Sequence, residues 1–252
     1  MPVDVWAGAA IGRRENQEDW HSVRQLGVDA GMLFVVADGM GGHAAGEVAS
    51  GTAGEAFVQS FFDNPDEPVT ERLMQAAQAA NLAIANRIAA EPELDGMGTT
   101  LVAAHLVGRS LSWISIGDSL LFLVSQGAVR RLNADHSYGA FLDRQAADGR
   151  ISAEDAANDP DRQALMSCVM GKEIDLVEVT EAPLDLGQDD ILIAASDGIE
   201  TLSPSDILSA LSEGQGDAAR IGKALFDRIA QINRRYQDNT TIVVLRGFGQ
   251  PD

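Results

Sequence analysis

Four aspartates stand at the ends of apolar stretches, where a charged side chain needs a specific reason. Asp38 follows "LFVVA", Asp118 follows "SWISIG", Asp197 follows "ILIAAS", and Asp238 comes just before "TTIVVL". Taken singly, an aspartate followed by glycine is a turn signal, because both residues tolerate positive φ. Taken together, the four positions suggest a shared site: if these strands share a sheet, their carboxylates would gather at one rim.

Gathered carboxylates repel one another and lose hydration, so either their pKa values rise or a cation lies among them. The sequence offers hard oxygen ligands near these positions and no HxxxH pair. That chemistry favours Mg²⁺ or Mn²⁺ over zinc or copper. Two such ions that share a carboxylate can activate a bridging water and direct it at phosphorus. The glycines after Asp38 would let a backbone carbonyl approach a metal closely.

An arginine beside such a site could orient a phosphate substrate through two parallel hydrogen bonds. The loop "GRRENQED" carries Arg14 close to Glu18 and Asp19, so Arg14 is the candidate. A solvated surface charge is the alternative for Arg14, and the spacing does not exclude Arg13 as the phosphate ligand.

Composition restricts the classes of function. The chain has 252 residues, with 38 acidic against 18 basic side chains and a net charge of −20, so we expect one large core and no nucleic-acid or membrane-surface binding. Cys168 is the only cysteine, which excludes an intrachain disulfide and makes a structural zinc–thiolate site implausible. The start of the chain does not resemble a signal peptide, and no apolar run is long enough to span a bilayer. We therefore expect a cytoplasmic protein.

The N-terminal half predicts strands at 3–12, 20–26 and 32–37, followed by two helices over most of 43–91. In the first of these helices Gly46, Ser50 and Gly54 are spaced four apart, which puts small residues on one face for close packing. Three closely spaced strand signals follow, and their spacing predicts consecutive antiparallel pairing. They cover residues 99–107, 110–118 and 120–132.

The C-terminal half begins with a polar, partly helical excursion at 136–172, with a helix start at "SAED". Strands at 175–184 and 189–196 resume the sheet. Ser203, Pro204 and Asp206 are typical of a helix N-terminus. A helix at about 216–236 and a strand from Thr240 complete the chain. Runs of strands and pairs of helices favour an α+β class over alternating βαβ units.

Six motifs occur in the order in which one family carries them: "RENQED", "ADGMGGHAAGEVAS", "MGTTLVAA", "ISIGDS", "AASDGI" and "DNTTIVV". From about Gly8 to Leu245 the chain resembles the metal-dependent protein serine/threonine phosphatases of the type 2C class, in their bacterial form. The resemblance implies a four-layer αββα sandwich of two antiparallel sheets flanked by antiparallel helix pairs. It also implies one catalytic domain over residues 1–252, with 136–172 as a flap that shapes substrate access.

The resemblance assigns roles by motif position, at a site for two Mn²⁺ or Mg²⁺ ions. Asp38 would bridge both metals as the central catalytic carboxylate, and Arg14 would bind the substrate phosphate. The remaining ligands would be the Gly39 carbonyl, Asp197, Asp238, Glu18 through a metal-bound water, and Asp19 as a supporting carboxylate.

This sequence departs from the family pattern at three places. Met40 stands where animal members have a proposed general-acid histidine, which leaves His43 or a metal-bound water as the proton donor. Leu120 replaces the arginine that usually follows the GDS motif. A third metal, with Asp118 as a ligand, is an open alternative. The acidic partner is missing there, since Thr201 occupies its position and Glu200 precedes it.

The resemblance implies hydrolysis of phosphoserine and phosphothreonine in proteins, by a monomer that opposes a serine/threonine kinase in signal transduction. Two alternatives are a catalytically inactive phosphoprotein-binding module and a phosphatase for small phosphate esters. For His105, His136 and Cys168 we favour structural roles. His105 would be a hydrogen-bonded core residue, His136 would start the flap, and Cys168 would be a small buried residue.

Overall fold

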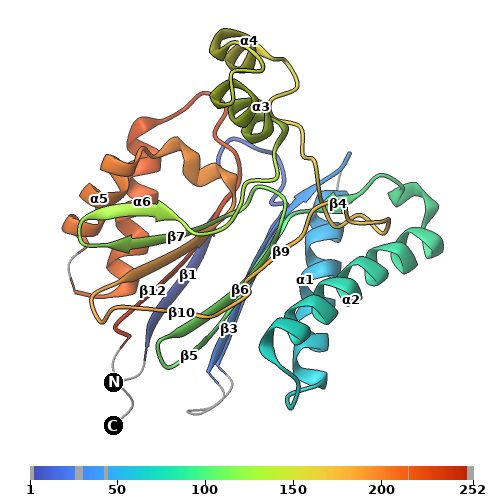
Figure 1. Ribbon diagram of the computed structural model, residues 1–252, viewed down its shortest axis with the longest axis horizontal. Coiled ribbons are helices and arrows are strands. Elements are labelled where there is room, and N and C mark those ends of the chain that lie inside the picture. The colour runs from blue at the N-terminus through green and yellow to red at the C-terminus, as the bar shows by residue number, and fades with distance from the viewer. Residues whose placement is uncertain (1–2, 26–30, 43–44, 215, 249–252) are drawn as a thin grey trace.

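The computed structural model describes residues 3–25, 31–42, 45–214 and 216–248. Two antiparallel β-sheets pack face to face, and a pair of helices covers the outer face of each sheet (Figure 1). The predicted αββα arrangement is therefore confirmed. No helix within the described ranges is both long enough and apolar enough to cross a bilayer.

One sheet contains the first and the last strand of the chain side by side. β1 and β12 pair antiparallel from Asp4–Arg246 to Ala10–Thr240. The loop that follows β1 and the loop that precedes β12 therefore leave the sheet at the same end. In spatial order the five strands are β1 (Asp4–Ala10), β12 (Thr240–Arg246), β11 (Ile191–Ala195), β7 (Leu120–Ser125) and β8 (Ala128–Arg131).

In the other sheet β3 is next to the edge, with the edge strand β2 on one side and β5 on the other. Across β2 and β3, Asp19 is directly opposite Asp38. In spatial order the main strands are β10 (Leu184–Asp185), β6 (Ser110–Ile116), β5 (Leu101–Val107), β3 (Met32–Met40) and β2 (Asp19–Gln25), while β4 (Gly98–Thr99) pairs with β3 and β9 (Glu178–Val179) pairs with β6.

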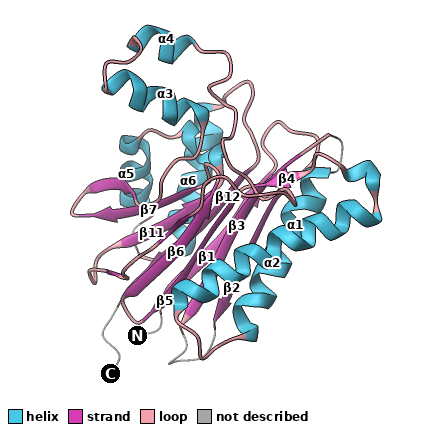
Figure 2. Ribbon diagram, turned by 45° about the vertical axis from the view of Figure 1, so that its right-hand side comes forward, coloured by secondary structure: helices cyan, strands magenta, loops and turns pink. Residues whose placement is uncertain are grey.

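α3, α4, α5 and α6 begin where the sequence supplies a capping side chain, whereas α2 follows Pro68 without one. Ser203 and Asp206 form the expected capping box at the start of α5, and Ser152 caps α4 through the backbone N–H of Asp155. The helices are α1 (Ala45–Asp63), α2 (Val69–Ala90), α3 (Tyr138–Ala147), α4 (Ala153–Asn158), α5 (Pro204–Glu213) and α6 (Ala218–Ile232), with 3₁₀ turns η1 (Pro92–Leu94) and η2 (Asp197–Thr201). α3 and α4 stand beyond one end of the strands (Figure 2).

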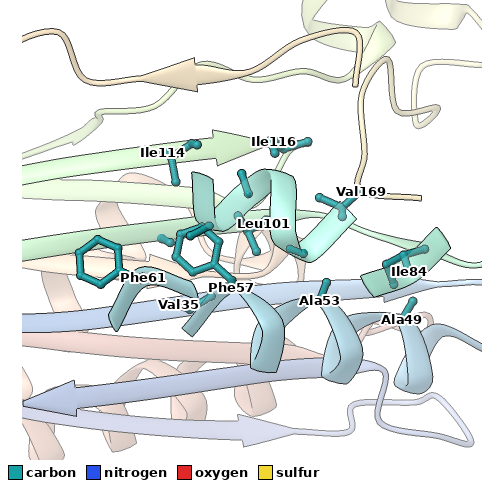
Figure 3. Close-up of a cluster of buried hydrophobic side chains, with 14 of the residues drawn as sticks. Val35, Ala49, Ala53, Phe57, Phe61, Ile84, Leu101, Ile114, Ile116 and Val169 are labelled. Atoms are coloured by element: carbon teal, nitrogen blue, oxygen red, sulfur yellow. The ribbon is translucent and has the colours of Figure 1, made fainter. Parts of the chain in front are cut away.

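Apolar side chains form three packed layers: between the sheets, under α1 and α2, and under α5 and α6. In the layer under α1 and α2, Phe57 and Phe61 extend from α1 toward strand residues such as Val35 and Leu101 (Figure 3). Each of these phenylalanines is fully buried, which stabilises the fold by about 1.5–3 kcal/mol per side chain.

The small face of α1 packs closely, as predicted, and its partner is β2. A Cβ atom added at Gly54 would lie 2.2 Å from the Trp20 ring, so the helix can approach only because this position has no side chain. The Ser50 hydroxyl donates to the backbone carbonyl of Glu18 at 2.6 Å. A Cβ at Gly46 would lie 2.7 Å from the Glu18 carboxylate. This face therefore fixes the position of Glu18.

The predicted pairing of three consecutive strands is wrong in part. β5 and β6 do pair antiparallel, but β7 leaves β6 and joins the other sheet beside β11. The stretch 120–132 is also a hairpin rather than one strand, because Gln126 and Gly127 both have positive φ and reverse the chain. Spacing along the chain does not distinguish a hairpin partner from a strand that crosses between two packed sheets.

Two further boundaries differ from the prediction. The stretch 175–184 forms only the short strands β9 and β10. The last helix ends at Ile232 rather than near 236, because Asn233 adopts the left-handed conformation (φ 51°) and ends the helix. The segment 233–239 is consequently a loop, and it carries Asp238.

Candidate metal centre

The predicted acidic residues except Asp19 line one cleft of about 660 Å³, at the end of the sandwich where β1 ends and β12 begins. They come from both sheets: Asp38 lies in β3 of one sheet, whereas Asp197 follows β11 and Asp238 precedes β12 of the other. The chain's four strand-end aspartates all line it, together with the predicted arginine. The lining residues predicted from sequence are Arg14, Glu18, Asp38, Gly39, Asp118, Asp197 and Asp238. His43, the candidate proton donor, lies outside the described residues.

Backbone hydrogen bonds hold Asp38 and Gly39 in place. The Asp38 N–H donates to the Thr100 hydroxyl at 3.0 Å, and the Thr100 N–H donates back to the Asp38 carbonyl at 2.9 Å. The Gly39 N–H donates to the Glu18 carbonyl at 3.1 Å. A Cβ at Gly39 would lie 2.0 Å from the Gly46 carbonyl oxygen, so only glycine fits between β2 and α1.

Two buried carboxylate oxygens at this site are left for a cation to compensate. Asp19 accepts a hydrogen bond from the Ser196 hydroxyl through one oxygen, at 2.7 Å. Its other oxygen and one oxygen of Asp197 are buried and have no hydrogen-bond partner among the described residues. Buried acceptors are rarely left unsatisfied, and carboxylate oxygens are the ligands that hard divalent cations take.

The carboxylates line the same cleft, but they do not yet form a complete set of metal ligands. Within the described part of the chain, no three His, Cys, Asp or Glu side chains are already arranged as a metal-ligand group. The Arg14 guanidinium donates to the Asp238 carboxylate and so joins the loop after β1 to the loop before β12. This contact also brings the predicted phosphate ligand to the edge of the acidic cluster.

Burial and mutual repulsion disfavour the charged forms of these groups. Burial, followed by the charges of Asp19 and Asp197, raises the pKa of Asp38 well above its usual range. Burial raises the pKa of Asp19 to about 6 and that of Asp118 to about 7. Burial and then Asp238 raise the pKa of Asp197. Divalent cations would remove this penalty by compensating the charge.

Because the pKa of Asp118 is raised, the stability of the metal-free protein should depend on pH. The folded pKa of Asp118, about 7, exceeds the unfolded value of ~3.9, so its stabilising contribution is lost as pH rises through 7. We expect Asp118→Asn to gain stability relative to the unsubstituted protein between pH 5.5 and 7.5, by more than about 1.4 kcal/mol, one pKa unit. Urea unfolding in EDTA measures this difference. Asp227→Asn, at an exposed position of α6, should show no such trend. A pH-independent difference for Asp118→Asn would contradict the argument.

The turn after Asp197 contains Thr201 and Glu200, the two residues considered as partners of Asp118 at a third metal. The Thr201 hydroxyl donates to the Gln237 side chain at 2.6 Å and is buried, so Thr201 supports the loop before β12. The charge of Glu200, by contrast, contributes to the raised pKa of Asp118. Of the two residues considered for a third metal, Glu200 is therefore the one that interacts with Asp118.

The sequence did not predict which polar residues support the cleft through hydrogen bonds. Asn239 accepts from the Glu18 N–H at 2.8 Å and donates to the carbonyls of Ile11 and Asn16, which ties the loop between β1 and β2 to the start of β12. Thr100, Ser196 and Ser50 act in the same way. The motifs "GTT", "ASDG" and "DNTT" contain these residues except Ser50, but sequence alone does not show which backbone groups they hold.

The segment 136–172 supplies one wall of the cleft through Gln163, Leu165 and Cys168. His136 anchors its base. The His136 N–H donates to the Gly117 carbonyl at 3.2 Å, and its ring Nδ1 accepts from the Gly117 N–H at 3.3 Å. Cys168 is half-buried and lines the cleft, so the expectation of a simple buried residue is only partly right. Burial raises the pKa of its thiol.

The other departures from the family pattern have clear positions. Met40 lines the cleft beside Gly39. Leu120 is buried in the apolar layer under α5 and α6, so it belongs to the core. His105 is buried, and the centre of its ring lies 5.1 Å from the centre of the Phe61 ring, in agreement with the predicted core role.

A family model described as protein phosphatase 2C matches residues 9–237. The chain is 37% identical to the serine/threonine protein phosphatase PstP of Mycobacterium tuberculosis over 180 residues, or 71% of this chain and 34% of that protein. It thus spans about a third of that relative's length. It is also 35% identical to the serine/threonine phosphatase stp of Listeria innocua, over 68% of each chain.

A solved structure of the PstP catalytic domain in complex with two manganese ions superimposes with a TM-score of 0.75 and 31% identity. The superposition covers 97% of this chain and 99% of that one.

Proposed function

The chain belongs to the protein phosphatase 2C family, and from this we propose that it hydrolyses phosphoserine and phosphothreonine in proteins. The observation that carries the proposal is the convergence of Asp38, Asp197, Asp238 and Glu18 in one cleft beside Arg14. We also propose that the protein is a monomer and that it opposes a serine/threonine kinase.

Asp38, Asp197, Asp238, the Gly39 carbonyl and Glu18 would hold two Mn²⁺ or Mg²⁺ ions, with Asp19 as their support. These ions would supply an activated water and positive charge for the phosphate. In support, a related catalytic domain binds two manganese ions, and the orphaned carboxylate oxygens of this site fit such cations. Asp118 and Glu200 would form a weaker third site.

Arg14 would bind the phosphate oxygens of the substrate. Its guanidinium reaches the cleft while its side chain is 54% exposed, so it can contact both the acidic cluster and an incoming ligand. The planar guanidinium matches two oxygens of a phosphate. Glu18 and Asp238 both interact electrostatically with Arg14 and raise its pKa, the hydrogen bond to Asp238 most strongly. Arg14 therefore remains charged.

Phosphate release from a phosphoserine peptide, a phosphothreonine peptide, an aryl phosphate and a set of small phosphorylated metabolites tests the proposal. We expect turnover of the peptides with Mn²⁺ and a clear preference for them over metabolites. Peptide binding without phosphate release would favour an inactive binding module instead. A preference for metabolites would favour the small-ester alternative.

Replacing Arg14 by lysine should keep the charge but lose the paired hydrogen bonds. We expect kcat/KM for the aryl phosphate to fall about ten- to hundredfold, as for ~1.5–3 kcal/mol of charge-assisted hydrogen bonding. Steady-state kinetics measures the fall. Arg13→Lys is the matched control, because Arg13 does not line the cleft. An equal loss in both variants would show that Arg14 has no special role.

A further inference from the structure

Three exposed arginines lie outside the cleft on the two loops that meet at its edge. Arg13 precedes the cleft residue Arg14, while Arg234 and Arg235 precede Asp238 in the 233–239 loop. We call Arg13, Arg234 and Arg235 the rim arginines. Both loops lie at the end of the sandwich that carries α3 and α4 (Figure 1).

Hydrogen bonds join the two loops and bring Arg13 to Asn233, the residue before Arg234 and Arg235. The Arg13 guanidinium donates to the Asn233 side chain at 2.7 Å, and the Arg13 N–H donates to the Gln237 carbonyl at 2.8 Å. Arg234 donates to the Glu200 carbonyl at 3.4 Å, which places it beside the turn that carries Asp197. The rim arginines therefore border the acidic cleft along the loops that carry Arg14 and Asp238.

The rim arginines keep their charge available. None of them forms an ion pair with an acidic residue in the described part of the chain, although acidic residues outnumber basic ones 38 to 18. Beside them, Tyr236 is 80% exposed, and the Arg235 guanidinium lies 5.0 Å from the centre of its ring. A basic surface that stays unpaired on so acidic a protein is suited to bind an anionic partner.

We propose that the rim arginines recognise acidic groups that flank the phosphorylated residue of the substrate. The inference rests on the proposed phosphatase function and specifies its substrate class: phosphopeptides with neighbouring carboxylates or a second phosphate. Arg14 holds the phosphate that is removed, and the rim arginines bind anionic side chains a few residues away.

The remaining surface limits this partner to a short segment. A net charge of −20 repels any long polyanion, and at physiological salt the attraction of the rim arginines extends only about 8 Å. A short run of acidic side chains can bind the rim arginines within this range. A nucleic acid would extend beyond them and would be repelled by the acidic surface around them.

The test compares two phosphoserine peptides of equal length, one with three flanking aspartates and one with asparagines in their place. We expect the native protein to prefer the acidic peptide in kcat/KM by about three- to tenfold at low salt, as a few exposed charge pairs allow. The preference should shrink as salt rises. In Arg13→Gln/Arg234→Gln/Arg235→Gln it should disappear, while aryl phosphate turnover stays unchanged. A peptide with a second phosphoserine in place of the aspartates tells whether phosphate or carboxylate is preferred.

The control Arg24→Gln/Arg87→Gln/Arg220→Gln removes the same charge from exposed positions elsewhere and should keep the preference. Equal rates on the two peptides, or an unchanged preference in the rim variant, would overturn the proposal while aryl phosphate turnover continued. Tighter binding of a single-stranded oligonucleotide than of the acidic peptide would also overturn it. Loss of all turnover in the native protein would instead count against the phosphatase function.

Discussion

Asp38→Asn is expected to lower kcat/KM for phosphopeptide and aryl phosphate by about a thousandfold or more. The charges of four neighbouring aspartates act on the Asp38 carboxylate. A neutral amide in its place could not bridge two cations. Loss of several kcal/mol of transition-state stabilisation corresponds to a rate loss of this size. Asparagine has the same shape, and the backbone bonds to Thr100 do not involve the side chain, so the fold should persist.

Stability supplies a second measurement for this variant. In chelator, Asp38→Asn should unfold at a higher temperature than the unsubstituted protein, because it removes a buried charge that its neighbours repel. Asp227→Asn serves as the control and should change neither activity nor unfolding. Full activity in Asp38→Asn would rule out a central role for this carboxylate.

Removal of divalent cations should abolish turnover altogether. We expect EDTA to bring phosphate release to the background rate, and excess Mn²⁺ or Mg²⁺ to restore it. Ligation should also stabilise the fold: at a hundredfold excess over Kd, one bound ion adds about 2.7 kcal/mol. For a chain of this size that is roughly 5–10 °C in Tm. Calorimetric titration with Mn²⁺ gives the stoichiometry, expected to be at least two.

The comparison with Asp38→Asn makes this prediction specific. The variant should lose most of the Mn²⁺-dependent rise in Tm, whereas Asp227→Asn should keep it. Turnover that continues in chelator, or an unfolding temperature that ignores Mn²⁺ in the native protein, would contradict a metal-dependent reaction.

Much of the fold could be predicted because local signals agreed with the final structure. The capping pattern at Ser203 and Asp206 gave the start of α5, and the small face of α1 predicted close packing. The acidic cluster was also predictable, because a carboxylate at the end of a buried strand is costly unless a cation or a donor compensates its charge. These features depend on residues close together in sequence or on the cost of burying charge.

The rest depended on contacts between distant parts of the chain. Nothing in the spacing of 110–132 tells that β7 joins the opposite sheet, because two packed sheets offer equally good apolar surfaces. Likewise, Asn239 and Thr100 support the cleft through backbone groups of other elements. A polar residue in a motif does not reveal which of many backbone groups it will bind. Such partners become visible only when the sheets are assembled.

The pairing of β1 with β12 has a consequence for biosynthesis. β12 lies between β1 and β11, so its sheet has a gap between these two strands until residues 240–246 have left the ribosome. The loop with Asp238 and the hydrogen bonds of Asn239 to Glu18 arrive with that strand. A nascent chain can therefore form the α1–α2 layer early, but the acidic cluster is completed only after residues 238–246 have been translated.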